Sequence, residues 1–364
     1  MERTVNQPRD KALHTVVLEQ VEQVNDETRV FRLGIPQGSS PIRFLPGQWL
    51  DVYVPDVEKA GGFTITSTPR EARLPHPRVS SSSSGHAEAA YCTTDEPPLC
   101  RREEEDKGAP SLGPGQKQDQ GPYLELAVQK SPGNLPAAWL WRDPPSSIVG
   151  RELRVRVGGG FVWPPPGVNV RALRRVVFVA GGVGVNPLVS MLTSLASAQT
   201  SALEVHFFYS LKDPRASGRP RIAKNLLFLD RIAGVFREKK IQGQLHVYLT
   251  DGGITKGPSS AVDGPAVTGK RKRGVGDDGR NQKPNLSDNE SVISCEGGDI
   301  PFHLRRCTVE QDVAATLGTL ADRRLAVVYV CGVPTMTDEF LAKLTDRNTG
   351  LSMEPHRVLH EKWW

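Results

Sequence analysis

Cysteine is scarce in this sequence, and its spacing excludes the common metal and disulfide frameworks. The 364 residues include five cysteines, an odd number without a CxxC pair, which favours reduced thiols in an intracellular compartment. The HExxH and GxSxG patterns of zinc and serine hydrolases are also missing. His356 and His360 form an HxxxH pair, but Pro355 argues against the helix that such a pair needs to bind a metal. We therefore expect no metal site and no hydrolase.

Long hydrophobic runs are missing as well. The longest, residues 176–192, is interrupted by three glycines, Asn186 and Pro187, so it predicts a strand, a turn and a helix rather than a membrane span. The N-terminal segment carries Glu2 and Asp10 and lacks the Arg/Ser-rich, acid-free character of a mitochondrial presequence, which favours a cytoplasmic protein if this end is complete. The net charge of +5 comes largely from scattered arginines, so we expect no nucleic-acid partner.

The most informative feature present is a glycine-dense turn, AGGVGVNP, from Ala180 to Pro187. It follows an apolar run, RVVFV, and precedes a stretch that can form a helix, LVSML. Glycines without side chains let a pyrophosphate approach main-chain N–H groups at a helix N-terminus. The alternative is a turn that only brings a helix close to a sheet. The candidate nucleotide-binding residues are Gly181, Gly182, Val183, Gly184, Val185, Asn186 and Pro187.

A second turn of the same kind follows later in the chain. The apolar run VVYV leads directly into CGVPTM, from Cys331 to Met336, and residues 337–344 predict a helix. Ligands of open α/β sheets bind at the carboxyl ends of the strands. Two such turns therefore indicate one shared crevice.

The periodicity of apolar residues divides the chain into two domains, at residues 12–167 and 170–364. The first contains six short β-rich runs, which favour a barrel. After Arg174, predicted strands at 176–180, 203–209, 245–250 and 325–330 alternate with helical stretches at 222–236 and 309–320, which favours a parallel sheet flanked by helices. The six runs of the first domain are 13–18, 28–33, 49–54, 63–66, 123–128 and 153–157.

Two polar segments belong to neither core. Residues 70–121 contain a run of five serines from Ser80 and many charges, and residues 251–300 are also poor in large apolar side chains. Neither segment can bury enough apolar surface to offset its ordering entropy, so we expect two disordered insertions. The basic run 270–273 is either a nuclear-import or nucleic-acid patch or a solvated loop.

Together these residues resemble the ferredoxin-reductase-like flavoprotein superfamily, whose members carry a GGxGxxP-type and a CGPxxM-type turn. GFTITSTP, residues 62–69, looks like the flavin-binding strand of that superfamily. Including the FYSLK run and the terminal EKWW, the chain is similar to the oxidoreductase NAD-binding domain-containing protein group over residues 12–70, 121–250 and 302–364. The resemblance implies a six-stranded antiparallel Greek-key flavin-type barrel followed by a Rossmann-like parallel-sheet nucleotide lobe.

The resemblance also implies an NAD(P)H-dependent oxidoreductase that passes a hydride from nicotinamide to FAD and electrons to an unknown acceptor. Its implied catalytic residues are Thr64, near the reactive flavin nitrogen, Cys331, facing the nicotinamide, and Trp364, a ring that stacks on the flavin and moves aside. The implied cofactor contacts beyond the first turn come from Phe63, Thr64, Ser210, Lys212 and Gly332. NAD(H) is favoured over NADP(H), and the group's association with mitochondria implies that location.

Two departures from the superfamily pattern concern the flavin. Gly61 stands where the flavin strand carries an arginine for the phosphate, and Ala137 stands where a hydroxyl residue begins a helix. Loss of a charge-assisted pair costs about 1.5–3 kcal/mol of binding, although Lys130 could compensate. The alternative function is a flavin-free pyridine-nucleotide-binding sensor or interaction module.

Overall fold

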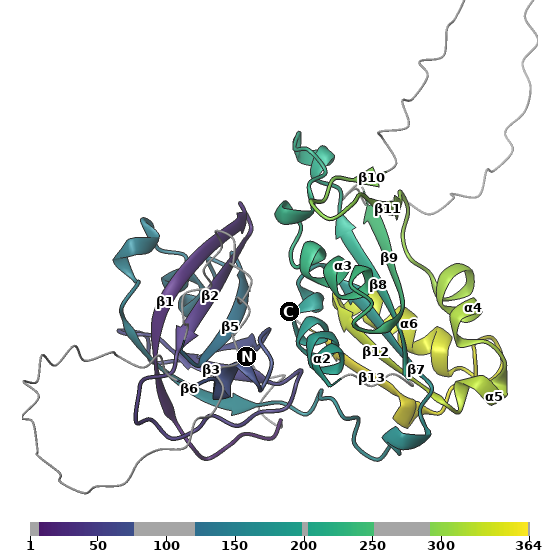
Figure 1. Ribbon diagram of the computed structural model, residues 1–364, viewed down its shortest axis with the longest axis horizontal. Coiled ribbons are helices and arrows are strands. Elements are labelled where there is room, and N and C mark those ends of the chain that lie inside the picture. The colour runs from purple at the N-terminus through teal and green to yellow at the C-terminus, as the bar shows by residue number, and fades with distance from the viewer. Residues whose placement is uncertain (1–6, 76–120, 199–202, 251–291, 363–364) are drawn as a thin grey trace, which may run out of the picture.

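The β-rich runs in the first part of the chain become six antiparallel strands. In the computed structural model, residues 7–75, 121–198, 203–250 and 292–362 are described. The strands pair in the order β4-β3-β6-β1-β2-β5 (Figure 1). They are β1 (His14–Asn25), β2 (Thr28–Gly34), β3 (Trp49–Tyr53), β4 (Gly61–Thr64), β5 (Tyr123–Gln129) and β6 (Glu152–Gly158).

The six-stranded sheet closes into a barrel because its two edges meet. Just after β4, Ile65 forms a bridge with Leu126 of β5, and the Thr66 amide donates to the Glu125 carbonyl at 2.8 Å. Along β1, Val16 and Leu18 are fully buried, while alternate residues face outward. Helix α1 (Leu135–Leu140) covers part of the barrel with buried Ala137 and Trp139. The predicted barrel is confirmed.

Strand β1 is longer than the sequence predicts, and its additional residues contact the second sheet. The polar segment after Leu18 continues as a hairpin with β2 to the pair Asn25 and Thr28. Val24 and Val30 of this hairpin pack against the core of the second sheet. The extension therefore joins the two halves of the molecule, which apolar alternation within one strand could not indicate.

The second part of the chain forms a seven-stranded sheet in the order β10-β11-β9-β8-β7-β12-β13. All neighbours are parallel except the hairpin β10–β11. The strands are β7 (Arg175–Gly181), β8 (Glu204–Lys212), β9 (Gln242–Thr250), β10 (Val292–Ile293), β11 (Ile300–His303), β12 (Ala326–Gly332) and β13 (Val358–Lys362). The helices are α2 (Val185–Ser197), α3 (Leu229–Arg237), α4 (Ala314–Leu317), α5 (Leu320–Arg323) and α6 (Pro334–Thr345).

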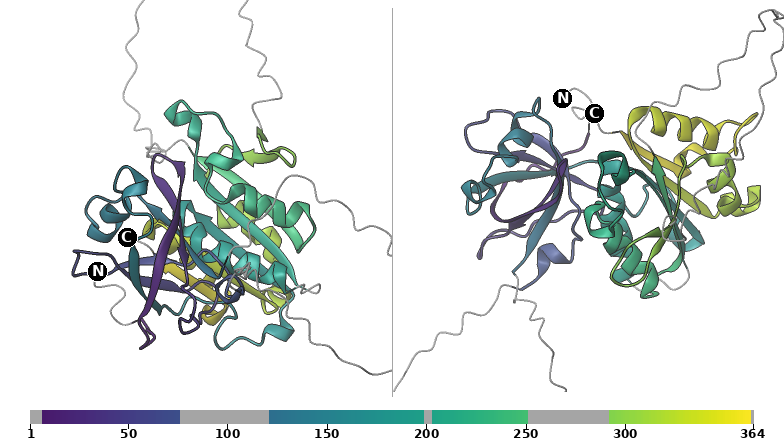
Figure 2. Two further views of the ribbon diagram at one scale, coloured as in Figure 1. Left: turned by 60° about the vertical axis from the view of Figure 1, so that its left-hand side comes forward. Right: turned by 90° about the horizontal axis from the view of Figure 1, so that it is seen from above.

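Helices cover both faces of this sheet. Figure 2 shows α2 and α3 between the sheet and the barrel, with α4, α5 and α6 on the opposite face. Strand β7 places Phe178 and Ala180 toward α2 and Val177 and Val179 toward the other face, and all four are fully buried. Burial on both faces explains why this strand reads as a continuous apolar run. The predicted Rossmann-like lobe is confirmed.

Two predicted helices are shorter than expected. The stretch 222–236 begins with a separate 3₁₀ turn, Ala223–Asn225, and α3 starts at Leu229 because Phe228 has a left-handed backbone, φ +56°. The stretch 309–320 is a π-helical turn, Val309–Val313, followed by α4, and it stops at Gly318, φ +65°. A residue with a left-handed backbone interrupts a helix. Helix propensity did not locate the interruptions at Phe228 and Gly318.

The limits expected for the two insertions were wrong at their ends. Residues Glu71–Arg73 form a 3₁₀ turn, and β10 and β11 belong to the sheet, with Ile293 fully buried. The remaining parts, 76–120 and 251–291, lie outside the described residues, and so does the basic run 270–273. Within the described ranges, no helix has the length and apolar character that a membrane crossing requires.

Candidate nucleotide-binding site

The turn between β7 and α2 combines an open glycine with an uncapped helix start. Gly182 is exposed, has φ +54°, and has no atom within 4 Å of the place where a Cβ would stand. A 3₁₀ turn, Gly182–Gly184, leads into α2, whose first turn carries neither a side-chain cap nor an acidic residue. Such a helix start favours an anion. The turn can therefore receive a phosphate on its open side.

The second glycine turn touches the first. A Cβ on Gly184 would stand 2.2 Å from the carbonyl oxygen of Cys331, and a Cβ on Gly181 would stand 2.7 Å from the Met336 sulfur. The strands that lead into the turns are neighbours, with Ala180 paired to Cys331. We call residues 181–185 and 331–333 the cradle. Close backbone approach, which only glycine permits, explains the glycines at positions 181, 184 and 332 where the two turns meet.

The residues that begin α2 are placed for packing as much as for a ligand. Val183 is half-buried, and Val185 and Pro187 are buried. Asn186 donates from Nδ2 to the carbonyl of Ala127 in β5 at 2.9 Å. Its Oδ1 is buried and finds no partner among the described residues. Asn186 therefore connects the cradle to the barrel, a role that the sequence did not indicate.

Ser210 and Lys212 lie inside β8, whereas we expected them just after it. Ser210 pairs in register with Gly181, so it lies beside the cradle on the next strand. Lys212 is the last residue of β8, and its ammonium lies 3.9 Å from the Glu27 carboxylate of the barrel. Asp213, which follows, is buried and bound by Arg221 at 2.5 Å. The adenosine-side candidates are thus brought next to the first turn.

The three implied catalytic residues are not brought together in the described structure. Cys331 is fully buried within the core cluster between the sheet and α2. Thr64 is buried at the end of β4, opposite Trp49. Trp364 lies outside the described residues. Their roles stay predictions.

The flavin-type strand has its phosphate position filled by apolar atoms. A Cβ on Gly61 would stand 2.6 Å from the Phe63 ring and 2.8 Å from the Cβ of Pro136 in α1. Phe63 is 8% exposed and packs within the barrel core, paired across the sheet with Leu50. An arginine at position 61 has no room here. The role of Phe63 as a cofactor contact stays a prediction.

The start of α1 does not supply a replacement for that arginine. Asn134 Oδ1 accepts a hydrogen bond from the Ala137 amide at 3.2 Å, which caps the helix from within. Ala137 is buried, and the Lys130 ammonium lies 5.4 Å from the centre of the Trp141 ring. The described residues therefore do not fit the diphosphate of FAD at the place that the resemblance implies.

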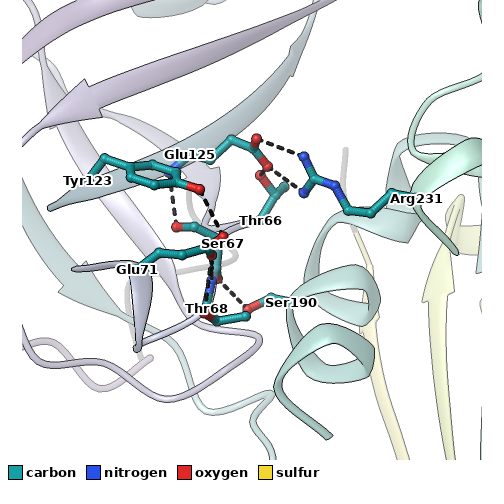
Figure 3. A network of polar contacts seen from close by, with 8 residues as sticks. All are labelled: Thr66, Ser67, Thr68, Glu71, Tyr123, Glu125, Ser190 and Arg231. Atoms are coloured by element: carbon teal, nitrogen blue, oxygen red, sulfur yellow. Dashed lines mark hydrogen bonds and ion pairs between the residues drawn. The ribbon is translucent and has the colours of Figure 1, made fainter. Parts of the chain in front are cut away.

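A polar network joins the barrel to α2 and α3 (Figure 3). Glu125 of β5 accepts two hydrogen bonds from Arg231 of α3, at 2.7 and 2.8 Å, and one from the Thr66 hydroxyl at 2.7 Å. Burial raises the pKa of the Glu125 carboxyl, but the hydrogen bonds and charge of Arg231 outweigh it and hold that pKa below its usual range. The pair is thus ionised at neutral pH.

The same network reaches α2 through the segment that follows β4. Ser190 of α2 donates to the Ser67 carbonyl at 2.7 Å, and the Ser67 hydroxyl accepts from the Glu125 amide at 3.0 Å. Glu71 accepts from the Thr68 amide at 2.6 Å and from the Tyr123 hydroxyl at 2.8 Å. Segment 62–69 was expected at a flavin, and none of the other network residues, Glu71, Tyr123, Glu125, Ser190 and Arg231, was predicted from the sequence. Ser190, a polar side chain on the apolar face of a predicted helix, was the available signal.

The histidine pair does not form a metal site. His356 lies in a 3₁₀ turn, Pro355–Arg357, and His360 lies in β13, so the two do not share a helix. Across residues 7–75, 121–198, 203–250 and 292–362, no group of three His, Cys, Asp or Glu side chains is arranged to hold a metal ion.

Similarity to known proteins agrees with this geometry. Residues 173–344 match the ferric reductase NAD binding domain family. The chain is 24% identical over 349 residues to Oxidoreductase NAD-binding domain-containing protein 1 of Danio rerio, covering 94% of this chain and 89% of that protein.

Two solved structures share the arrangement of barrel and lobe. One is the flavohem-like FAD/NAD binding domain of nitric oxide dioxygenase from Vibrio cholerae, with a TM-score of 0.52 and 13% identity over 96% of this chain and 98% of that one. The other is a ferredoxin NADP+ reductase from Neisseria gonorrhoeae with bound FAD and NADP, with a TM-score of 0.51 and 14% identity over 98% of this chain and all of that one. At these identities they establish the fold.

Proposed function

We propose that the chain binds a nicotinamide nucleotide in the cradle and acts as an NAD(P)H-dependent oxidoreductase. Its similarity to the ferric reductase NAD binding domain family over residues 173–344 and to Oxidoreductase NAD-binding domain-containing protein 1 supports this proposal. The observation that carries this proposal is the contrast between two glycines of one turn. Gly184 is packed against Cys331, while Gly182 faces open space at a helix start. Packing explains the first. The left-handed backbone of Gly182, φ +54°, by itself favours glycine, and the open space beside it at an uncapped helix start suits an anion.

The strand register places a neighbouring strand on each side of the first turn. Gly181 pairs with Ser210 on one side, and Ala180 pairs with Cys331 on the other. Neighbouring strands lie about 4.8 Å apart. The resemblance described above implies that a nucleotide with its pyrophosphate at Gly182 has its adenosine half over β8 and its nicotinamide half over β12.

The chemistry that this arrangement supports is hydride transfer. The protein has to orient the nicotinamide and exclude water, and it does not need a strong acid or base. Because the residues near Gly61 do not fit the diphosphate of FAD, the proposal includes no step through a tightly held flavin. The acceptor is then an exchangeable molecule that enters the crevice beside the nicotinamide.

A second candidate is a nucleotide-binding sensor or interaction module without flavin. It is favoured by the apolar contact of Phe63 and Pro136 over Gly61, which removes the place for a phosphate-binding arginine. It differs from the first candidate in one respect: the bound nucleotide would not be oxidised.

The test combines binding and turnover on the full chain. NADH binding is measured by fluorescence titration, and NADH oxidation is followed by absorbance with free FAD or a quinone as the acceptor, because either can accept a hydride. Gly182→Val should abolish binding, because its side chain would occupy the open space of the cradle.

Gly38→Val is the matched control. Gly38 is also exposed, has φ +80°, and has no atom within 4 Å of its Cβ position, but it lies in the barrel. The same backbone strain should therefore leave NADH binding unchanged. Binding without turnover under any acceptor would favour the sensor, and equal NADH affinity in a folded Gly182→Val variant would refute the cradle.

A further inference from the structure

The tip of the β1–β2 hairpin contacts the nucleotide lobe at the segment before α3 (Figure 1). Asn25 donates from Nδ2 to the carbonyl of Asn225 at 3.2 Å. The next two residues are acidic: Asp26 forms an ion pair with Arg219, and Glu27 lies 3.9 Å from the Lys212 ammonium. Val24 packs against the core of the lobe. The apolar contact and the amide fix the tip of the hairpin against the lobe, and the two exposed carboxylates reach the cations from there.

The partners of these carboxylates lie at the carboxyl end of β8. Lys212 is the last residue of that strand, and Arg219 follows the 3₁₀ turn Pro214–Ser217. Ser210, two residues before Lys212, pairs with Gly181 of the cradle. If the proposed function holds, the adenosine ribose of the nucleotide lies over this end of β8, next to both cations.

Two of the cations at this place are already paired with carboxylates, and this pairing disfavours a phosphate on the ribose. Arg215 of the same turn adds a further positive charge, which acts on Asp213. A 2′-phosphate is bound in dinucleotide sites by a nearby arginine or lysine, whereas a free 2′-hydroxyl is bound by an acidic residue. Here Lys212 and Arg219 are paired with barrel carboxylates. The lobe's own Asp213 is buried and bound by Arg221. A 2′-phosphate would have to displace two carboxylates and would be repelled by them.

We propose that Asp26 and Glu27 are specificity-determining residues that make the cradle select NAD(H) over NADP(H). The inference rests on the proposed function, since it concerns the ligand of the same site. The selectivity comes from the barrel, which supplies negative charge across the domain interface to a site that the lobe builds.

The experiment is a fluorescence titration of the full chain with NADH and with NADPH. Wild-type protein should bind NADH more tightly. In Asp26→Asn/Glu27→Gln, NADPH affinity should rise about tenfold, as expected for two exposed charge pairs, while NADH affinity changes by less than about twofold. Because exposed charges are screened by salt, the gain should shrink between low and high ionic strength. A purely structural role of the hairpin would not show this salt dependence.

Two further variants separate charge from position. Glu22→Gln removes a carboxylate from β1 four residues, about 13 Å, before Asp26, and it should leave the preference unchanged. Adding Lys212→Gln to the double variant should reverse most of the gain in NADPH affinity.

The possible results are distinct. A wild-type preference for NADPH, or an unchanged NADH/NADPH ratio in the folded double variant, overturns the inference while leaving nucleotide binding intact. If neither nucleotide binds to the wild-type chain, the proposed function fails and the inference fails with it.

Discussion

Glycines in the β7–α2 turn and in strand β4 serve opposite purposes. At Gly182 the absence of a side chain leaves open space at the start of a helix, whereas at Gly61 the same absence is required because Phe63 and Pro136 already fill the volume. The first arrangement keeps room for a ligand. The second arrangement stabilises the barrel at the expense of a phosphate position. The role of a glycine in either motif therefore depends on the atoms around its Cα, which the sequence alone does not give.

The largest expected effect is a loss of stability from a side chain placed between the two turns of the cradle. Gly184→Ala would place a methyl group 2.2 Å from the Cys331 carbonyl oxygen, and backbone on both sides has to move. We expect a loss of about 3 kcal/mol or more in the free energy of unfolding, measured in urea. Gly182→Ala is the paired variant, with open space and only left-handed strain of about 1–2 kcal/mol. Equal losses in the two variants would contradict the packing described here.

The opposite change restores the superfamily residue in the flavin-type strand. Gly61→Arg should destabilise the barrel by about 2–3 kcal/mol, because its Cβ meets Phe63 and Pro136, and it should not increase FAD binding. Adding Phe63→Ala should make room for the new side chain. A stable Gly61→Arg protein that holds FAD would show that this region adapts, and that the filled position is not a barrier.

Variants of the Glu125–Arg231 pair test whether the barrel helps to position the nucleotide-binding lobe. Arg231→Met leaves the Glu125 carboxylate half-satisfied, with the Thr66 hydroxyl still donating. We expect a cost of about 1–2 kcal/mol, reduced by the partial exposure of Arg231, and a weaker affinity for NADH. The double variant Glu125→Gln/Arg231→Met should recover part of the stability. If NADH affinity is unchanged in Arg231→Met, the network does not position the cradle.

The same pair predicts a dependence on pH. The pKa of Glu125 is lower in the folded protein than its usual value, so its contribution is present at neutral pH and is lost as the pH falls through the lowered value. We expect the contact to weaken below about pH 4. Near-ultraviolet circular dichroism against pH would measure this, and Glu125→Gln should remove the acid-dependent part.

The smallest expected effect is at Ser190. Ser190→Ala removes one buried hydrogen bond to the Ser67 carbonyl, which should cost about 1 kcal/mol in the free energy of unfolding. NADH affinity should stay within about twofold, because the start of α2 is unchanged. A large loss of affinity would mean that this bond sets the position of the helix.

Much of the fold was predictable because its strands are short, β-branched and bounded by turns. Strand β7 and its glycine turn were located to within a residue, since burial on both faces gives a continuous apolar run. Breaks at Phe228 and Gly318 were not predicted, because a left-handed backbone at one residue leaves little trace in periodicity. The extension of β1 was missed because its apolar residues face another domain.

The candidate site was predictable in part for the same reason. Both turns of the cradle were found from their glycines, and the structure brings them into contact. Asn186, Glu125, Arg231 and Ser190 act across the interface between two domains, and no spacing within one element encodes such contacts. The missing arginine at Gly61 was noticed in the sequence, but the volume that Phe63 and Pro136 occupy beside Gly61 needed the structure.

The nucleotide-binding turn is open at Gly182, while Phe63 and Pro136 fill the place of a phosphate-binding arginine at Gly61. Equilibrium dialysis with the two ligands distinguishes these positions. The purified chain is dialysed against NADH and against FAD in parallel, and the ligand retained is measured by absorbance. The account predicts that NADH is retained and that FAD is lost to the buffer, leaving a colourless protein. Stoichiometric FAD that survives dialysis, with no retained NADH, would contradict it.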